Sequence, residues 1–101
     1  MYRTKDFDEH LSKQLKNTKY RKEYLQQLTR PFDGEEGLSL IDALKDIIST
    51  MGVSEFAKLC KMERSSVSRI LSQETLPKVD TLNRMLRPFK FRIKLELEEV
   101  A

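Results

Sequence analysis

The 101 residues carry a net charge of +3, with 35% charged and 39% hydrophobic side chains, a composition typical of one soluble, helix-rich domain. No stretch approaches the roughly 18 apolar residues that cross a bilayer, and we expect neither a membrane span nor a signal peptide. The single cysteine, Cys60, can form no internal disulfide and no metal site with the single His10 alone, which favours a reduced, cytoplasmic setting without metal or other cofactor.

The first section, residues 1–37, is predicted to hold two short helices and a loop that pack on the rest of the domain. The first helix has an apolar stripe at four-residue spacing, Phe7, Leu11 and Leu15. Thr18 is the expected N-cap of the second helix, which ends before Pro31 because the residue before a proline disfavours helix. The apolar stripe of this second helix is Tyr20, Tyr24, Leu25 and Leu28. Residues 32–37, with two glycines and three acids, are predicted to form the loop.

The densest basic run of the chain lies in these two helices. A solvated helix face is the preferred interpretation, and a dedicated phosphate-binding patch is the alternative. The run comprises Lys13, Lys16, Lys19, Arg21 and Lys22.

The second section, residues 38–88, is richer in apolar residues and is predicted to contain four helices. Ser39 is the expected cap of the first, and Gly52 is expected to end it. The apolar positions of this helix follow i, i+3, i+4, i+7 spacing: Leu40, Ile41, Leu44, Ile47, Ile48 and Met51. Ser54 is the expected cap of the second helix, which buries Phe56, Ala57, Leu59 and Cys60.

The third and fourth helices of this section follow two breaks in the pattern. Residues 61–63 form a turn, and residues 64–71 form a helix with Val67, Ile70 and Leu71 inward. After a loop around Pro77, the fourth helix is defined by Val79, Leu82, Met85 and Leu86 and is stopped by Pro88.

The third section, residues 89–101, has a different period. Apolar residues alternate strictly with charged ones, which predicts a half-buried β-strand. The apolar positions are Phe89, Phe91, Ile93, Leu95 and Leu97. The expected architecture is therefore an all-α bundle with extra N-terminal helices and one C-terminal strand.

Two short helices joined by a three-residue turn predict a DNA-binding helix-turn-helix over residues 53–71. Ala57 allows the two helices to cross closely, and Met62 points inward after the turn. The outward face of the second helix offers short polar groups and two arginines, which suit a major groove. The candidate DNA-binding residues are Arg64, Ser65, Ser66, Ser68, Arg69, Ser54, Lys61, Ser72 and Lys78.

A family resemblance is carried by the run from Met51 to Lys58, by Leu71, Ser72 and Pro77, and by Thr81, Leu82 and residues 89–93. These residues resemble the probable addiction-module antidote family, the HigA-like antitoxins of the Xre/Cro helix-turn-helix superfamily. The resemblance spans about residues 18–95. It implies a lambda-repressor-like bundle, a RelE-like toxin as partner, double-stranded DNA as ligand and autorepression of a toxin–antitoxin operon.

The chain departs from the family pattern at four positions. Lys61 stands where glycine is usual in the turn, at a strain cost of about 1 kcal/mol. Glu55 and Glu63 replace a glutamine and a serine near the DNA backbone, and Leu76 replaces an asparagine. Two carboxylates facing phosphates repel them, which keeps open the alternative of a protein-interaction module with weak or no DNA binding.

A lone strand leaves its backbone groups unpaired and needs a partner. We expect the same strand of a second copy, antiparallel about a two-fold axis, with Phe91, Ile93, Leu95 and Leu97 as the dimerisation residues. With Leu95 on the axis, lysine and arginine face glutamates and Ile93 faces Leu97. Residues 1–5 of the same chain or a strand of the toxin are the alternatives. A dimer is also expected to raise the affinity for DNA. One monomer bound to DNA releases only about four or five counterions, which gives a slope of log affinity against log salt near −4.

No catalytic constellation accompanies these patterns, and no enzyme activity is expected. His10 is interpreted as a solvated surface residue, and Cys60 as a core residue. Glu35 and Glu36 are interpreted as solvent-exposed loop residues rather than a general acid–base pair.

Overall fold

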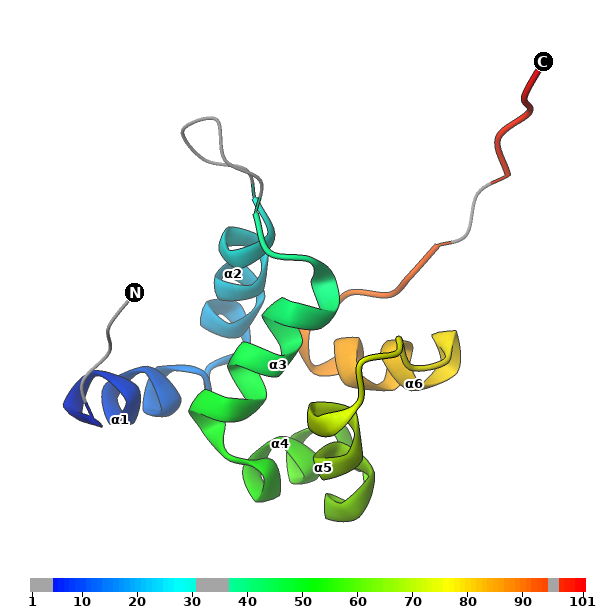
Figure 1. Cartoon of the computed structure of the whole chain (residues 1–101). Helices are drawn as coiled ribbons and strands as arrows, with labels where there is room; N and C mark the ends of the chain where they lie inside the picture. Colours follow the sequence, from blue (N-terminus) through cyan, green and yellow to red (C-terminus); the bar gives the residue numbers. More distant parts are fainter. Residues whose placement is uncertain (1–4, 31–36, 95–96) are drawn as a thin grey trace.

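The computed structural model of the chain describes residues 5–30, 37–94 and 97–101, and within these ranges it is helical and has no strand. The elements are α1 Lys5–Gln14, α2 Thr18–Thr29, α3 Leu40–Met51, α4 Val53–Cys60, α5 Arg64–Ser72, α6 Val79–Leu86 and the 3-10 helix η1 Arg87–Phe89. The central element is α3, which contacts α1, α2, α4 and α5 (Figure 1). None of the described helices combines the length and the apolar character that a membrane crossing requires.

The helix ends follow local chemistry. The Ser39 hydroxyl oxygen caps α3 by accepting a hydrogen bond from the Asp42 N–H at 3.2 Å, as predicted. Arg30 is extended, with φ −79° and ψ 134°, and ends α2 one residue before Pro31. The N-cap of α2 is Asn17, whose side-chain oxygen accepts from the Tyr20 N–H at 3.0 Å, so the prediction of Thr18 as the cap was wrong by one residue.

Gly52 joins α3 to α4 without an intervening loop. Its φ of 95° lies where a side chain is strained, and this conformation lets it end α3 and cap α4 at once. The Gly52 carbonyl accepts from the Phe56 N–H at 3.0 Å, which starts α4 at Val53. Ser54 therefore lies inside the first turn and makes no side-chain cap, contrary to the prediction.

One hydrophobic core unites the helices. Leu11, Leu15 and Leu25 of the first two helices belong to the same buried cluster as the side chains of α3–α6. Leu59 and Leu71, predicted as buried, are only half-buried, and Val79 is 38% exposed. The largest fully buried side chains are Phe56, Phe89, Leu15, Leu44, Ile47, Ile48, Met85 and Val67. The predicted loop at residues 32–36 and the side chain of Phe7 lie outside the described parts.

Arg21 is buried, which corrects its assignment to a solvated basic face. Its guanidinium donates to the carbonyl oxygens of Leu15 at 2.9 Å, Lys16 at 3.3 Å and Pro88 at 3.0 Å. The fixed donor geometry of arginine allows one side chain to reach all of these acceptors. Arg21 thereby joins the end of α1 to the residue that precedes the C-terminal segment.

The C-terminal segment departs most from its prediction. Phe89 belongs to η1 and is fully buried, because Pro88 fits the first turn of a helix. Lys90 then turns the chain with φ 65°, and residues 91–94 and 97–101 form no strand in the single chain. Phe91 and Ile93 are half-buried while Arg92 and Lys94 are exposed, so the predicted alternation of burial is present over these four residues.

Candidate nucleic-acid interface

Helices α4 and α5 are held at a fixed angle by the turn between them. Lys61 adopts the left-handed conformation, with φ 56° and ψ 46°, and the Met62 N–H donates to the Ala57 carbonyl at 2.9 Å. Ala57 is buried, and Met62 packs against the core. Val67 and Ile70 anchor α5 from beneath. The opposite side of α5 is left to solvent.

That outward face carries the polar residues singled out from the sequence. Arg64, Ser65, Ser68, Arg69 and Ser72 are exposed, and Ser66 is half-buried. Within the described residues neither arginine forms an ion pair, so both guanidinium groups are available to a ligand. The Ser72 hydroxyl donates to the Arg69 carbonyl at 3.0 Å, which leaves its oxygen as an acceptor only.

The other three candidates flank this face. Ser54 lies in the first turn of α4, Lys61 in the turn and Lys78 at the N-cap of α6, and all three are exposed. Glu55 lies next to Ser54, and its carboxylate is 3.8 Å from the ammonium group of Lys58. An exposed pair of this kind is weak, and it neutralises part of the negative charge near the turn.

A hollow beside α5, which we call the α5–α6 groove, has a volume of about 440 Å³. Three of the predicted residues, Ser66, Arg69 and Lys78, line it. Four further polar residues, which sequence analysis missed, join them from the C-cap of α5, the loop and α6: Gln73, Thr75, Thr81 and Arg84. The charged side chains among the described residues that line the groove are Arg69, Lys78 and Arg84, and no carboxylate is among them, so the lining itself is positively charged.

The i, i+3 spacing of Thr81 and Arg84 places both on one side of α6. That spacing was the signal for a shared face, but the sequence does not tell which neighbour the face meets. The ammonium group of Lys45 donates to the Gln73 carbonyl at 2.7 Å, which fixes the end of α5 against α3 and so shapes the groove.

Cys60 lies in the core, as interpreted from the sequence. It is 4% exposed, and its sulfur lies 3.8 Å from the Met85 carbonyl oxygen. Burial raises the pKa of the thiol to about 12, and the positive charge of Arg21 opposes part of that rise. A neutral, enclosed thiol is a poor nucleophile and a poor metal ligand. Among the described residues no group of three or more His, Cys, Asp or Glu could hold a metal ion.

The predicted dimerisation residues are not gathered into one surface in the single chain. Phe91 and Ile93 pack against the core, Leu97 is fully exposed and Leu95 lies outside the described residues. The backbone at the start of the segment is fixed, because the Ile93 N–H donates to the Asn83 side-chain oxygen at 2.7 Å.

Comparison with known proteins gives one assignment. No curated protein and no solved structure matches the chain significantly. The family model of the probable addiction module antidote proteins matches residues 3–97, which is nearly the whole sequence. The chain therefore belongs to the family of probable addiction module antidote proteins.

Proposed function

We propose that this protein is the antitoxin of a toxin–antitoxin module, and that it binds a RelE-like toxin and represses its own operon. Membership of the antidote family supports the antitoxin role. In this proposal the protein acts in the cytoplasm and has no enzymatic activity. Residues 38–88 form a DNA-binding domain of the Xre type, residues 1–37 pack on it, and residues 89–101 mediate assembly.

The single observation that carries the DNA-binding part is the exposed face of α5 beside the positive α5–α6 groove. α5 acts as the recognition helix of a helix-turn-helix, with Arg64 and Arg69 reading guanine edges or binding phosphates. Ser65 and Ser68 are short enough to let the helix approach the bases. Ser66, Lys78 and Arg84 contact the phosphate backbone from the groove.

The remaining candidates complete the contact surface in this proposal. Ser54 and Lys61 lie where the backbone of the same DNA strand passes the start of α4 and the turn. Ser72 supplies an acceptor, because its hydrogen is engaged by the Arg69 carbonyl. The Glu55–Lys58 pair weakens the repulsion that Glu55 alone would exert on phosphate.

The test of DNA binding is a gel shift on the DNA upstream of the protein's own gene. We expect a shift for the wild type and a loss of at least tenfold in affinity for Arg64→Ala and for Arg69→Ala, because each removes a charged contact worth about 1–3 kcal/mol. Arg30→Ala, an exposed arginine at the end of α2, is the matched control and should bind like the wild type.

The toxin partner is tested separately by co-expression with the reading frame adjacent to the gene. We expect the neighbouring product to arrest growth alone, and the antitoxin to restore growth and to co-purify with it. Growth that is unaffected by the neighbour would remove the toxin–antitoxin proposal and leave DNA binding open.

The second candidate is a protein-interaction module that has the same fold but does not bind DNA. The exposed carboxylates of Glu55 and Glu63 at the edge of the α4–α5 surface favour it. The absence of a gel shift even at low salt, together with toxin binding, would select this candidate.

The proposal includes a homodimer in which residues 91–97 of two copies pair as antiparallel strands. Such pairing satisfies the backbone groups that are unpaired in an isolated extended segment. Light scattering on the eluting protein tests it, and a chain that binds its operator specifically as a monomer would contradict it.

A further inference from the structure

Two hollows lie side by side at the base of the C-terminal segment. The first, which we call the apolar groove, has a volume of about 220 Å³ and is lined chiefly by Leu25, Leu40, Leu86, Phe91 and Ile93. The second, which we call the cationic pocket, has a volume of about 530 Å³ and is lined by Asn83, Arg87, Lys90, Phe91 and Arg92. Phe91 and Arg92 line both hollows, so the two form one continuous surface.

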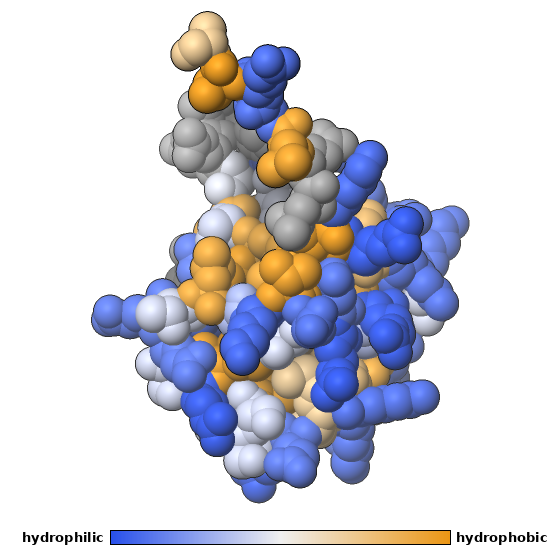
Figure 2. Space-filling model, turned by 90° about the vertical axis from the view of Figure 1, so that its right-hand side faces the viewer, coloured by the Kyte–Doolittle hydropathy of each residue, from blue (hydrophilic) through white to orange (hydrophobic). Residues whose placement is uncertain are grey.

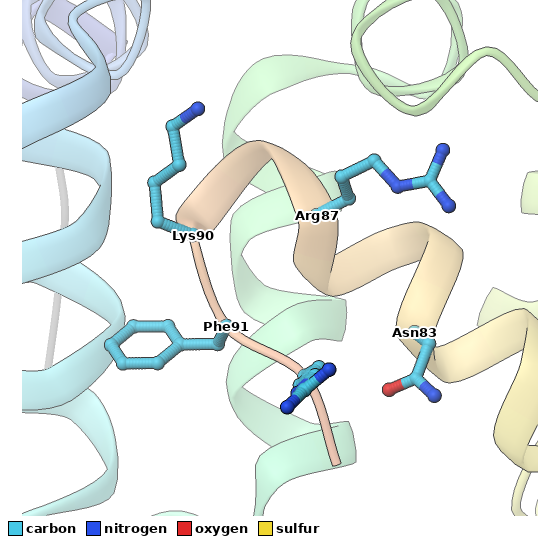
Figure 3. Close-up of a pocket in the computed structure, with 5 residues that line it drawn as sticks. Asn83, Arg87, Lys90 and Phe91 are labelled. Atoms are coloured by element: carbon cyan, nitrogen blue, oxygen red, sulfur yellow. The ribbon is translucent and has the colours of Figure 1, made fainter.

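The cationic pocket concentrates positive charge that the described residues lining it do not neutralise. Arg87, Lys90 and Arg92 are exposed, and no carboxylate lies among the described residues that line the pocket. None of the three forms an ion pair with any described residue. Figure 3 shows Arg87 and Lys90 projecting from the two ends of η1, while Phe91 points away from them toward α2. A fourth cation is close, because the Lys22 ammonium lies 5.5 Å from the centre of the Phe91 ring.

The apolar groove lies next to this charge on the same face. Figure 2 shows hydrophobic side chains gathered beside the base of the C-terminal segment, with hydrophilic ones around them. Two hydrogen bonds fix the groove wall: the Phe91 N–H donates to the Leu86 carbonyl at 3.3 Å, and the Ile93 N–H to the Asn83 side chain at 2.7 Å. These bonds hold the backbone of Phe91 and Ile93, which form one wall of the groove, in place.

The chain itself carries a segment with the complementary chemistry. Residues 97–101 lead away from the helices (Figure 1), and two of their apolar side chains are solvent-exposed, Leu97 at 105% and Val100 at 83%. Between them lie Glu98 and Glu99, and these five residues include no basic side chain. The order is apolar, acidic, acidic, apolar, which matches an apolar groove that borders a cationic pocket.

We propose that residues 97–101 of a second copy of this chain dock on this surface, with Leu97 of the second copy in the apolar groove, its Glu98 on the cations of the pocket and its Glu99 beside Phe91 and the Lys22 ammonium group. This inference rests on the proposed dimer and specifies the surface to which residues 97–101 of the second copy bind. The register with Leu95 on the two-fold axis places Leu97 of the second copy beside Ile93, which lines the groove, and its Glu98 beside Arg92, which lines both hollows. Because the contact is reciprocal, each dimer contains it twice.

The test is the dimer dissociation constant of the full chain, measured by sedimentation equilibrium. We expect Leu97→Ala to weaken the dimer about tenfold or more, because it removes a buried apolar side chain from two symmetric contacts. Leu76→Ala, a similarly exposed leucine in the loop before α6, is the matched control and should leave the constant unchanged.

Charge reversal tests the pocket. Glu98→Lys with Glu99→Lys, and separately Arg87→Glu with Arg92→Glu, should each weaken the dimer, and combining all four changes should restore much of the affinity. Glu9→Lys, an exposed acid on α1, is the control. Circular dichroism of each variant establishes that the helices are intact.

The position of the tail is tested by mixing two variants that each carry one added cysteine, Leu97→Cys and Leu40→Cys. A disulfide between the two different chains supports the proposal, and the buried Cys60 does not compete. A disulfide found only within one doubly substituted chain would overturn it in favour of the chain's own tail. Tail variants that dimerise normally but lose the toxin would overturn it in favour of the toxin. Failure of the DNA-binding proposal is distinguishable, because Arg69→Ala should weaken the gel shift at least tenfold and leave the dimer constant unchanged.

Discussion

Lys61 adopts a backbone conformation that lysine does not favour. Its φ of 56° is left-handed, a region in which a side chain costs about 1 kcal/mol relative to glycine. The family resemblance predicted this strain, because glycine is usual at this position of the turn, and the backbone confirms the left-handed conformation. The side chain is exposed and positively charged next to α5.

We expect Lys61→Gly to raise the free energy of unfolding by about 1 kcal/mol, because glycine adopts this backbone without strain. In the proposed function the same variant loses DNA affinity, since one phosphate contact is removed. Urea denaturation and the gel shift measure the two effects. A variant that is stabilised and binds DNA as tightly as the wild type would exclude Lys61 from the interface.

Arg21 is a residue whose role could not be read from the sequence. Within a basic run it looks like its solvated neighbours, but its guanidinium is buried and donates to three carbonyl oxygens and to the Thr18 hydroxyl at 3.3 Å. It also lies 6.0 Å from the centre of the Phe89 ring. Arg21 differs in burial from the other basic residues of the run only because α2 packs against η1.

We expect Arg21→Lys to lower the free energy of unfolding by about 2 kcal/mol, because one ammonium group cannot reach the separate acceptors and leaves a buried carbonyl unpaired. Thermal or urea denaturation checks this, with Lys19→Arg on the exposed side of α2 as the control. If Arg21→Lys is as stable as the wild type, the hydrogen bonds of Arg21 contribute nothing to the fold.

The buried Cys60 thiol makes the free energy of unfolding depend on pH in the alkaline range. Its pKa is raised from 9.0 to about 12 by burial, so folding favours the neutral thiol. This contribution is complete below pH 9 and is lost between pH 9 and pH 12, because the unfolded chain ionises first. We expect Cys60→Ala to lower stability at pH 8 through the cavity it creates, and to flatten the alkaline decline by about 1–2 kcal/mol near pH 10.5. Urea denaturation at both pH values measures it.

At the scale of the element, helix ends were predictable and the neighbours of each helix were not. Ser39, Gly52 and Pro31 act through their own backbone neighbourhood, so their effect can be read along the chain. The sequence prediction placed the cap of α4 at Ser54 because it gave Gly52 only the role of ending α3. In the structure Gly52 both ends α3 and caps α4. The α5–α6 groove was missed because its two walls meet through packing, which helical spacing does not encode.

We expect Arg84→Ala to weaken operator binding about threefold to tenfold and to reduce the slope of log affinity against log salt by about one, as for a single phosphate contact. Fluorescence anisotropy at several salt concentrations measures both quantities. Arg30→Ala is again the control. An unchanged slope would place the DNA backbone away from the α5–α6 groove.

At the scale of the whole molecule, the C-terminal segment distinguishes structure that forms within one chain from structure that needs a second strand. The alternation of apolar and charged residues predicted a strand, and residues 91–94 retain the alternation of burial without the hydrogen-bonded ladder. A ladder needs a second strand, and the described residues of a single chain provide none. Within the described residues the sequence pattern of a strand is therefore present without a partner strand, and the pairing with a second copy stays a prediction.

A dimer changes the response of DNA binding to salt. Two α5 surfaces release about twice the counterions of one, so we expect a salt slope near −8 for the dimer and near −4 for a variant that has lost the dimer. Anisotropy titrations of the wild type and Leu97→Ala between 50 and 200 mM salt compare them. Equal slopes would show that one subunit alone contacts the operator.

The hydrogen bond from the Ile93 N–H to Asn83 fixes where the C-terminal segment leaves α6. In the proposed dimer, the chain between the two copies of Ile93 is a bridge of extended segments, and an extended chain advances about 3.3 Å per residue, close to the rise of one base pair. The length of that bridge sets the distance between the two recognition helices. The spacing of the operator half-sites is then encoded in residues that never touch DNA, and lengthening the bridge by two residues per subunit would move the preferred half-sites apart while keeping each inward-facing side chain on its own face.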